Sequence, residues 1–297
     1  MIYFIVNPAA GSGKAKKAVP IIEKIMNDNL AEYSVIYTSS PDDFLQVSSL
    51  IDYSTAKSIV CVGGDGTIQE YVGLAVGRAV KFGVIPAGSG NDLIHSIPGD
   101  DRKFRKFEDK IKFFTEKIIK GENMPLDAVS VNGEKYFFNI GGTGIDIQVL
   151  KDALPLKKFF SGAAYFISLI KNIFTYKAME MTLTIDGNTE TNEFLLLAVC
   201  NGSYYGGNLH IAPPAAINDG FITLCKVVKI PRIKLLALFP SVKLGNHAKL
   251  KQVSFVTCRE VKLEFDNKKL INLDGNLFEF ESSIKFKIIE NAVNFIV

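Results

Sequence analysis

The chain has 297 residues, of which 47% are hydrophobic and 22% charged, enough for one large domain or two ordinary ones with packed cores. This composition excludes a disordered chain, and the net charge of +3 is too small to indicate nucleic-acid binding by itself.

The cysteines and the apolar runs indicate the compartment. None of the four cysteines shows Cys-x-x-Cys spacing, and they lie in or beside apolar runs (Cys61, Cys200, Cys225 and Cys258). We therefore expect buried free thiols in a reducing compartment. The apolar run 1–6 has no basic leader and is too short for a signal peptide, and nowhere do eighteen apolar residues run together. These features predict a soluble cytoplasmic protein without a transmembrane span.

The N-terminal part of the chain alternates short apolar runs with amphipathic ones. We expect strands at 2–6, 33–38, 58–62 and 82–85, and helices after residue 14 and at 41–51, 68–79 and 102–120. This alternation is typical of an open parallel sheet with short crossovers, which binds ligands at the carboxyl ends of its strands. The last of these helices mixes basic residues with apolar ones, and we interpret it as amphipathic with a solvated charged face; contact with a membrane is the weaker alternative.

A glycine-rich turn, Gly63-Gly64-Asp65-Gly66-Thr67, follows the third expected strand and opens a helix. Such a turn exposes backbone N–H groups to an anion, and we expect Thr67 to cap the helix. Asp65 cannot bind a phosphate directly, so it needs Mg²⁺ or a hydroxyl group to polarise. The alternative is a tight structural turn with an exposed aspartate.

Two further small-residue loops follow expected strands, at 7–14 and 86–93. The first is not a Walker A loop, because Pro8 stands where the first glycine would be and Ala15 where a Mg²⁺-binding Ser or Thr would be. A structural turn stays open as its explanation. Because all three loops follow parallel strands, we expect them at one edge of the sheet.

After Gly121 the pattern changes to alternating runs separated by turn dipeptides. It predicts a second, mostly antiparallel β domain with strands at 128–131, 135–140, 181–185, 194–200, 221–228, 253–257, 261–265 and 278–280. The apolar helical segment 154–176 interrupts it and serves either core packing or an acyl-chain pocket. The segment 221–259 has no acidic residue, and its basic apolar character suits anionic lipid, although this indication is weaker than the motifs.

Taken together, four stretches resemble the diacylglycerol kinase catalytic-domain family, which includes soluble bacterial diacylglycerol kinases, related lipid kinases and the sphingosine kinases. They are Asn7-Pro8-Ala9-Ala10-Gly11, Gly63-Gly64-Asp65-Gly66-Thr67, Ala87-Gly88-Ser89-Gly90-Asn91-Asp92, and the stretch from Asn201-Gly202 to Asp219-Gly220. The Gly-Gly-Asp-Gly-Thr motif alone is shared with NAD kinases and phosphofructokinases. The ordered set of four, spread over nearly the whole chain, is much more specific.

The resemblance implies an α/β fold: an N-terminal, Rossmann-like open parallel-sheet domain for ATP at 1–122 and a C-terminal, mostly antiparallel β-sandwich domain for the lipid at 123–297. The active site would lie in the interdomain cleft, and residues 286–297 would pack back on the first domain. The implied ATP contacts are Asn7, Pro8, Ala9, Ala10, Gly11, Thr38, Gly63, Gly64, Asp65, Gly66, Thr67, Ile68, Gln69 and Ser89.

The resemblance also implies two magnesium sites. A catalytic Mg²⁺ network, partly mediated by water, would involve Asp65, Asp92 and Asp127. A structural Mg²⁺ in the β domain would bind Asp219 and the carbonyls of Ala216 and Phe221, which are oxygen ligands of the kind that Mg²⁺ prefers. The reaction would transfer the γ-phosphoryl group of ATP to a primary hydroxyl of a lipid. Lys14, Lys16 or Lys17 would offset phosphate charge, with a solvated helix face as an equal alternative.

Two positions depart from the family pattern. The family's Asp-Gly-Glu, whose glutamate acts as base, is Asp274-Gly275-Asn276 here, and the family's arginine after Asn-Asp is His95. An amide cannot accept a proton near neutral pH, so Asn276 can only orient a hydroxyl. Three outcomes stay open: Asp65 is the base, as its counterpart is in the sphingosine kinases; Asp274 is the base; or transfer is slow or lost.

These features predict an ATP- and Mg²⁺-dependent lipid kinase for diacylglycerol or a related lipid, taken from the inner face of the membrane by peripheral contact. The alternatives are a degenerate homologue that binds nucleotide or lipid with weak transfer, and, less favoured, an enzyme of the NAD kinase type. The apolar segment 154–176 argues against a polar substrate. The lipid, the effect of Asn276 and His95, the general base and a homodimeric state stay open.

Overall fold

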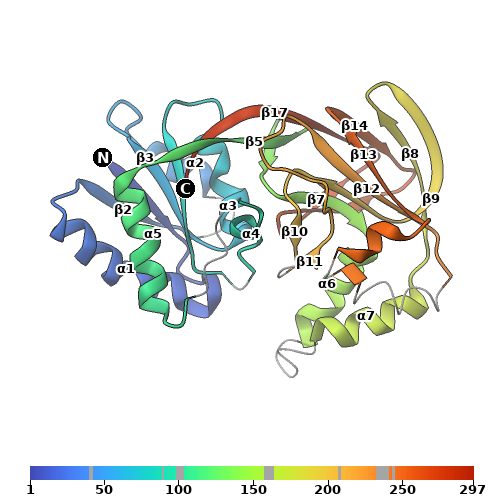
Figure 1. Cartoon of the computed structure of the whole chain (residues 1–297), viewed down its shortest axis with the longest axis horizontal. Helices are drawn as coiled ribbons and strands as arrows, with labels where there is room; N and C mark the ends of the chain where they lie inside the picture. Colours follow the sequence, from blue (N-terminus) through green and yellow to red (C-terminus); the bar gives the residue numbers. More distant parts are fainter. Residues whose placement is uncertain are drawn as a thin grey trace.

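The computed structural model describes residues 1–39, 43–88, 90–97, 104–156, 164–206, 209–231, 241–242 and 245–297. Figure 1 shows two halves that lie side by side and are joined through β5 and β17. The elements of the first half are β1 (Ile2–Val6), α1 (Ala10–Asp28), β2 (Tyr33–Tyr37), α2 (Phe44–Ser49), β3 (Ser58–Gly63), α3 (Asp65–Tyr71), the 3₁₀ helix η1 (Val72–Leu74), β4 (Lys81–Pro86), α4 (Asp92–Ser96) and α5 (Phe107–Lys120).

The first half is the expected parallel sheet, in the order β2-β1-β3-β4. All residues of β1 and β3 are buried, as strands covered on both faces require. Helices α1 and α5 contact each other on one face of the sheet. The sheet therefore brings the loops after β1, β3 and β4 to a single edge.

The helix expected over 68–79 is shorter in the structure. Helix α3 ends at Tyr71, a 3₁₀ turn follows, and Gly77 takes a left-handed backbone with φ +70°. Glycines at 73 and 77 weaken a helix, and this explains the early end. The expected cap is also wrong: Gly64 holds the N-cap position and no side chain caps the helix. Thr67 lies inside the first turn, where its hydroxyl accepts a hydrogen bond from Asn7.

The second half is mostly antiparallel. Its elements are β5 (Asn123–Val131), β6 (Lys135–Phe137), β7 (Ile140–Gly144), α6 (Ile145–Leu156), α7 (Ala164–Thr175), β8 (Met179–Ile185), β9 (Asn188–Cys200), β10 (Tyr204–Tyr205), β11 (Leu209–His210), β12 (Ile222–Val228), the 3₁₀ helix η2 (Asn246–Lys249), β13 (Val253–Cys258), β14 (Glu260–Glu264), β15 (Lys269–Leu273), β16 (Asn276–Phe280) and β17 (Ser283–Ile296). Strands β5, β8, β9, β12, β14, β15 and β17 all contribute to one apolar core, which indicates that the sheet folds over on itself.

One long strand connects the two halves. β17 pairs with β14 and β5 in the second half and, through Asn294 and Phe295, runs parallel to β4 of the first. Its register against β5 shifts between Ile289 and Val293. The described strands thus form one 15-stranded sheet, with β10 and β11 as a separate pair. The strand expected over 135–140 is divided into β6 and β7 around Phe138 and Asn139.

The described part of the 154–176 segment packs on one side. Ile173 is buried in a third core cluster with residues of β9 and β12, whereas Ile167 and Phe174 are 40% and 50% exposed. The four cysteines are buried and free, as the prediction of buried free thiols required. No helix among the described residues is both long and apolar enough to cross a membrane.

Candidate active site

The three glycine-bearing loops meet at the carboxyl edge of the parallel sheet. Ala87 and Gly88 donate backbone hydrogen bonds to the Gly63 carbonyl over 2.8 and 3.0 Å, and Asn7 donates to Val62 over 3.2 Å. A side chain on Gly11, whose φ is +59°, would overlap the Ala87 carbonyl, so this position requires glycine. Below, we refer to the loops 7–13, 63–66 and 86–91 together as the glycine rim.

The expected nucleotide contacts fall on this rim or beside it. Thr38 follows β2 and donates a backbone hydrogen bond to Val6 at the end of β1, over 2.9 Å. Ile68 and Gln69 lie in α3 with buried side chains, 1% and 5% exposed. The Gln69 amide donates to the Tyr136 carbonyl over 3.2 Å, so its side chain faces the second half of the chain and not the rim. Ser89 lies outside the described residues.

Two carboxylates converge beside the rim. A Cβ placed on Gly90 would lie 3.1 Å from Oδ2 of Asp65 and 3.1 Å from Oδ2 of Asp92. The Asp65 Oδ1 accepts the backbone N–H of Leu93 over 3.1 Å, which ties α3 to α4. Burial, and next the charge of Asp92, raise the pKa of Asp65 above its ordinary value, while backbone N–H groups of residues 91–93 oppose this rise.

The pair of Asp65 and Asp92 suits a hard cation. Two buried carboxylates of like charge repel each other, and a Mg²⁺ ion coordinated by oxygen atoms would relieve that repulsion. Among the described residues no cluster of three or more His, Cys, Asp or Glu side chains could hold a metal on its own. An ion here would therefore take its other ligands from water or phosphate.

Asp274 approaches the same carboxylates from the second half. It is 8% exposed, and its two oxygens accept the backbone N–H groups of Phe138, Asn139 and Ile140 over 2.7–3.2 Å. Burial raises the pKa of Asp274 to about 7 against the effect of these N–H groups, and the charge of Asp65 adds to the rise. Both Asp274 oxygens are thus already hydrogen-bonded, and Asp65 likewise accepts backbone N–H groups of residues 91–93.

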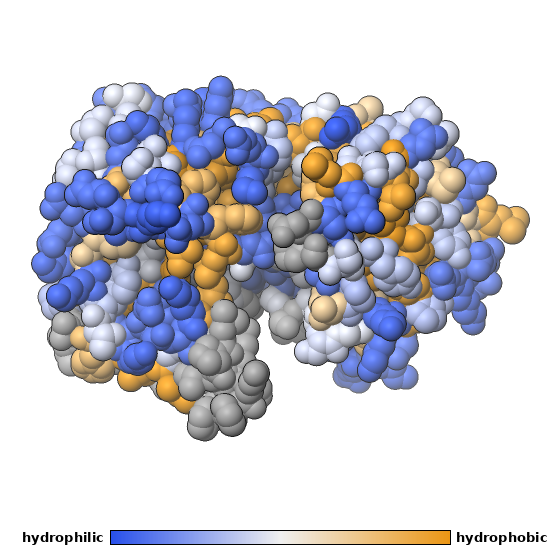
Figure 2. All heavy atoms as spheres, turned by 180° about the vertical axis from the view of Figure 1, so that it is seen from behind, coloured by the Kyte–Doolittle hydropathy of each residue, from blue (hydrophilic) through white to orange (hydrophobic). Residues whose placement is uncertain are grey.

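Asn276 lies across the cleft from α3. Its Nδ2 donates to the Gly66 carbonyl over 3.0 Å and to Oε1 of Gln69 over 2.7 Å. The residue that replaces the family's glutamate therefore joins the two halves by hydrogen bonds. A carboxylate has no proton to donate near neutral pH and could not make either contact. Figure 2 shows the surface hollowed between the two halves.

The third aspartate of the expected magnesium network has other contacts. Asp127 accepts the backbone N–H groups of Gly220 over 2.7 Å and Asn291 over 2.8 Å. Burial raises the pKa of Asp219, and the charge of Asp127 adds to this rise. Asp127 thus lies beside the expected structural site of Ala216, Asp219 and Phe221. Asp219 accepts the Phe221 N–H over 3.0 Å, which folds this turn so that two of the three expected ligand residues adjoin.

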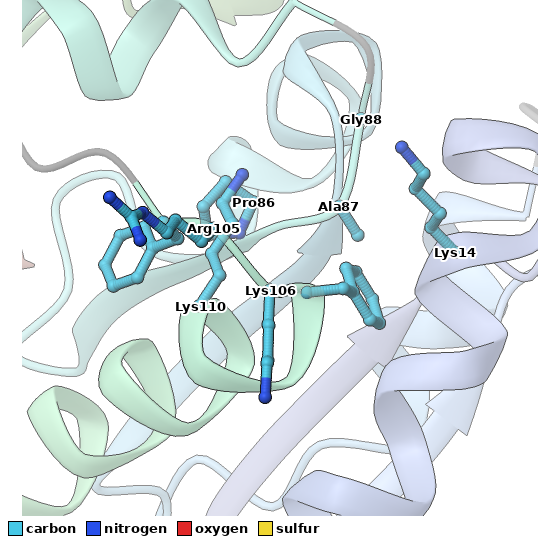
Figure 3. A pocket seen from close by; sticks show the side chains of 9 residues that line it. Lys14, Pro86, Ala87, Gly88, Arg105, Lys106 and Lys110 are labelled. Carbon is cyan, nitrogen blue, oxygen red and sulfur yellow. The ribbon is translucent and has the colours of Figure 1, made fainter.

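A basic pocket borders the rim on the side of α1 and α5 (Figure 3). It has a volume of about 210 Å³ and is lined by Lys14, Pro86, Ala87, Gly88, Phe104, Arg105, Lys106, Phe107 and Lys110, without an acidic side chain. Lys14 extends from α1 toward Gly88. Of the three lysines expected to offset phosphate charge, Lys14 lines this pocket; Lys16 and Lys17 do not.

Sequence reasoning missed two groups of residues. The cations at 105, 106 and 110 fall in the expected helix 102–120, whose charged face we assigned to solvent; in the structure α5 begins at Phe107, so only Lys110 is helical. The helical period shows which residues share that face, but it cannot show that the loop at Ala87 and Gly88 lies opposite. Asn139 carried no motif signal at all, because its partners are distant in sequence. His95, the substitute for the family's arginine, is exposed and lies near the Tyr204 ring, with 6.3 Å between ring centroids.

Comparison with known proteins agrees with this geometry. The diacylglycerol kinase catalytic domain matches residues 1–131, and the YegS C-terminal NAD kinase beta sandwich-like domain matches residues 140–296. The diacylglycerol kinase of Bacillus subtilis strain 168 is 28% identical over 274 residues, covering 91% of this chain and 88% of its own. That of Mycobacterium tuberculosis strain H37Rv is 27% identical over 266 residues, covering 88% and 84%.

The fold has a close structural counterpart. The crystal structure of a diacylglycerol kinase from Bacillus anthracis strain Sterne superposes with a TM-score of 0.76 at 21% identity, covering 99% of this chain and 96% of that one. It shows that both halves and their connection follow a known two-domain fold. The chain belongs to the diacylglycerol kinase catalytic-domain family and is a phosphotransferase with an alcohol acceptor.

Proposed function

We propose that this protein is a Mg²⁺-dependent lipid kinase that transfers the γ-phosphoryl group of ATP to a primary hydroxyl of diacylglycerol or a related lipid. One observation carries the proposal: Asp65 and Asp92 converge beside the glycine rim, at the cleft into which Asp274 and Asn276 reach from the other half. In phosphoryl transfer the protein mainly positions the attacking and leaving oxygens in line and neutralises charge.

The residues divide these tasks. The cations of the basic pocket border the glycine rim, where they would offset the charge of a triphosphate. Asp65 and Asp92 would hold the Mg²⁺, which neutralises charge on the phosphate oxygens when bound. The carboxylate of Asp65 would accept the proton of the lipid hydroxyl, while Asn276 stays hydrogen-bonded to Gly66 and Gln69 beside it.

The lipid would enter from the second half. Ile167 and Phe174 of α7 are exposed apolar side chains in a helix that otherwise packs on β9 and β12. This exposed apolar face supports peripheral contact with a membrane or its lipids.

The test is transfer of ³²P from γ-labelled ATP to a panel of lipids in mixed micelles with Mg²⁺. We expect label in a phosphorylated lipid, with diacylglycerol among the acceptors. Thermal stabilisation by ATP without labelled lipid would favour a degenerate binding protein, which the Asn276 contacts make the second candidate. Phosphorylation of NAD with no lipid product would overturn the proposal.

A further inference from the structure

Asn139 is buried, 3% exposed, in the short connection between β6 and β7. Every polar atom of this residue has a partner. Its backbone N–H donates to the Asp274 carboxylate over 3.1 Å, and its carbonyl accepts the N–H groups of Asn201 and Gly202 over 2.9 Å each. Its side-chain Oδ1 accepts the Ser96 hydroxyl over 2.7 Å, and its Nδ2 donates to the Tyr204 carbonyl.

These partners come from separate parts of the fold. Asp274 lies at the turn between β15 and β16, and Tyr204 begins β10, both in the second half. Ser96 ends α4 in the first half. The Ser96 hydroxyl also accepts the N–H groups of Ser203 and Tyr204 over 3.3 and 3.4 Å. Asn139 and Ser96 together thus connect α4 to the second half.

Helix α4 carries one of the two converging carboxylates. Asp92 is its first residue, and the N–H of Leu93 holds Asp65. A shift of α4 would therefore move Asp92 and release one contact of Asp65 at the same time. At position 202 a Cβ would overlap Oδ1 of Asn139, so only glycine leaves room for this arrangement.

We propose that Asn139 is a positioning residue, which fixes α4 and its Asp92 against the Asp274 turn through the Ser96 hydroxyl. The inference rests on the proposed function for its kinetic consequences only. A misplacement of about 1 Å can reduce a rate by ~10²-fold without weakening substrate binding, because transfer depends on alignment. Asn139 would then act on kcat through Ser96, without touching the substrate.

The test uses the full chain with four variants: Asn139→Ala, Ser96→Ala, their combination, and Ser96→Thr, which retains a hydroxyl. Thr115→Val is the matched control, because the Thr115 hydroxyl is fully buried and donates only within α5, to Ile111 over 2.8 Å. The measurements are kcat and KM for ATP with the accepted lipid, and hydrogen exchange of the amides of residues 93–96.

We expect Asn139→Ala to lower kcat by about 10- to 100-fold with KM for ATP within about twofold. Ser96→Ala should lower kcat less, and Ser96→Thr should restore it. The double variant should be no slower than Asn139→Ala within about twofold, because the two residues act as a unit. The amide hydrogens of α4 should exchange faster in Asn139→Ala than in the wild type, and at the wild-type rate in Thr115→Val.

The inference is overturned if Asn139→Ala retains kcat, if the two single effects multiply, or if α4 exchanges as in the wild type. Should Asn139→Ala fail to fold, the partly exposed Ser96→Ala and Ser96→Thr carry the test alone. If the wild-type protein transfers no phosphate to any lipid, the proposed function fails, and the exchange of α4 decides this inference separately.

Discussion

The side-chain amide of Asn276 donates a hydrogen bond to the carbonyl of Gly66 across 3.0 Å, and Gly66 lies in the glycine turn that opens α3. The position at which the family resemblance implies a catalytic base is thus occupied by a group that joins the two halves by hydrogen bonds. Closing the cleft and accepting a proton are therefore alternative uses of this one position.

Asn276→Glu separates these uses. We expect a faster kcat, because a carboxylate at this position adds a second proton acceptor beside Asp65. We also expect a lower Tm, because two hydrogen bonds worth about 1 kcal/mol each are lost. Lipid phosphorylation and thermal unfolding measure the two effects. Asn276→Gln, which keeps the amide, serves as control and should not gain rate. An unchanged kcat in Asn276→Glu would show that a missing base does not limit this protein.

Asp65→Asn should remove activity. The amide oxygen can still accept the Leu93 N–H, so the fold should survive, whereas the proton acceptor and one magnesium ligand are lost. We expect kcat to fall by at least about 10²-fold in the ³²P assay. Asp52→Asn is the matched control, because the exposed Asp52 carboxylate accepts hydrogen bonds from the hydroxyl groups of Ser54 and Thr55 in a local turn. Retention of more than about half of the rate in Asp65→Asn would exclude Asp65 as base.

Removal of divalent ions should reveal the proposed structural site. We expect a chelator to lower Tm and added Mg²⁺ to restore it, because an ion bound only to the folded state stabilises that state. Asp219→Asn should lack this response, since the amide provides a weaker, neutral ligand. The exposed Asp266→Asn should respond like the wild type. If the chelator leaves the wild-type Tm unchanged, no ion at Asp219 stabilises the folded state.

Asp146 should make stability depend on pH. Burial raises the pKa of Asp146 to about 6 from an ordinary value of 3.8, and its Oδ1 has no hydrogen-bond partner. Between these values the folded state binds the extra proton, so stability is greatest below pH 4 and falls as the pH rises toward 6. Asp146→Asn should therefore be more stable than the wild type at pH 7 and similar at pH 4.

Thermal unfolding at a series of pH values measures this difference. Asp152→Asn should change the stability in the opposite direction. The hydrogen bond from Lys171 lowers the pKa of Asp152, so the ionised Asp152 stabilises the fold slightly near neutral pH and loses this effect as the pH falls. Wild-type and Asp146→Asn curves that run parallel from pH 4 to pH 7 would contradict the prediction.

The sequence predicted the positions of the three loops well, because each follows a strand of consecutive apolar residues and contains glycine at close backbone contacts. Strand β17 was not predicted as a strand, although its packing on the first half was expected. Its alternation is interrupted near Asn291, which has φ +51° and lies within the register shift. The period of two therefore breaks in the middle of a single strand.

The site itself was predicted in part. Motif resemblance identified Asp65, Asp92 and Asp274, but it could not show that both Asp274 oxygens accept backbone N–H groups. Nor could it show that Asn276 contacts Gly66, which lies 210 positions away in the sequence. Such contacts depend on how the two halves approach each other, and local patterns do not encode that approach.

The register shift in β17 has a mechanical consequence. A strand with neighbours on both sides cannot slide along its axis without breaking a whole ladder of hydrogen bonds, so a change in the angle between the two halves would bend β17 together with its partner β5. The least regular place for a bend is at Asn291, whose N–H is held by Asp127. Asp127 in turn adjoins Asp219. An ion at Asp219 would therefore lie beside the least regular point of the strand that joins the two halves.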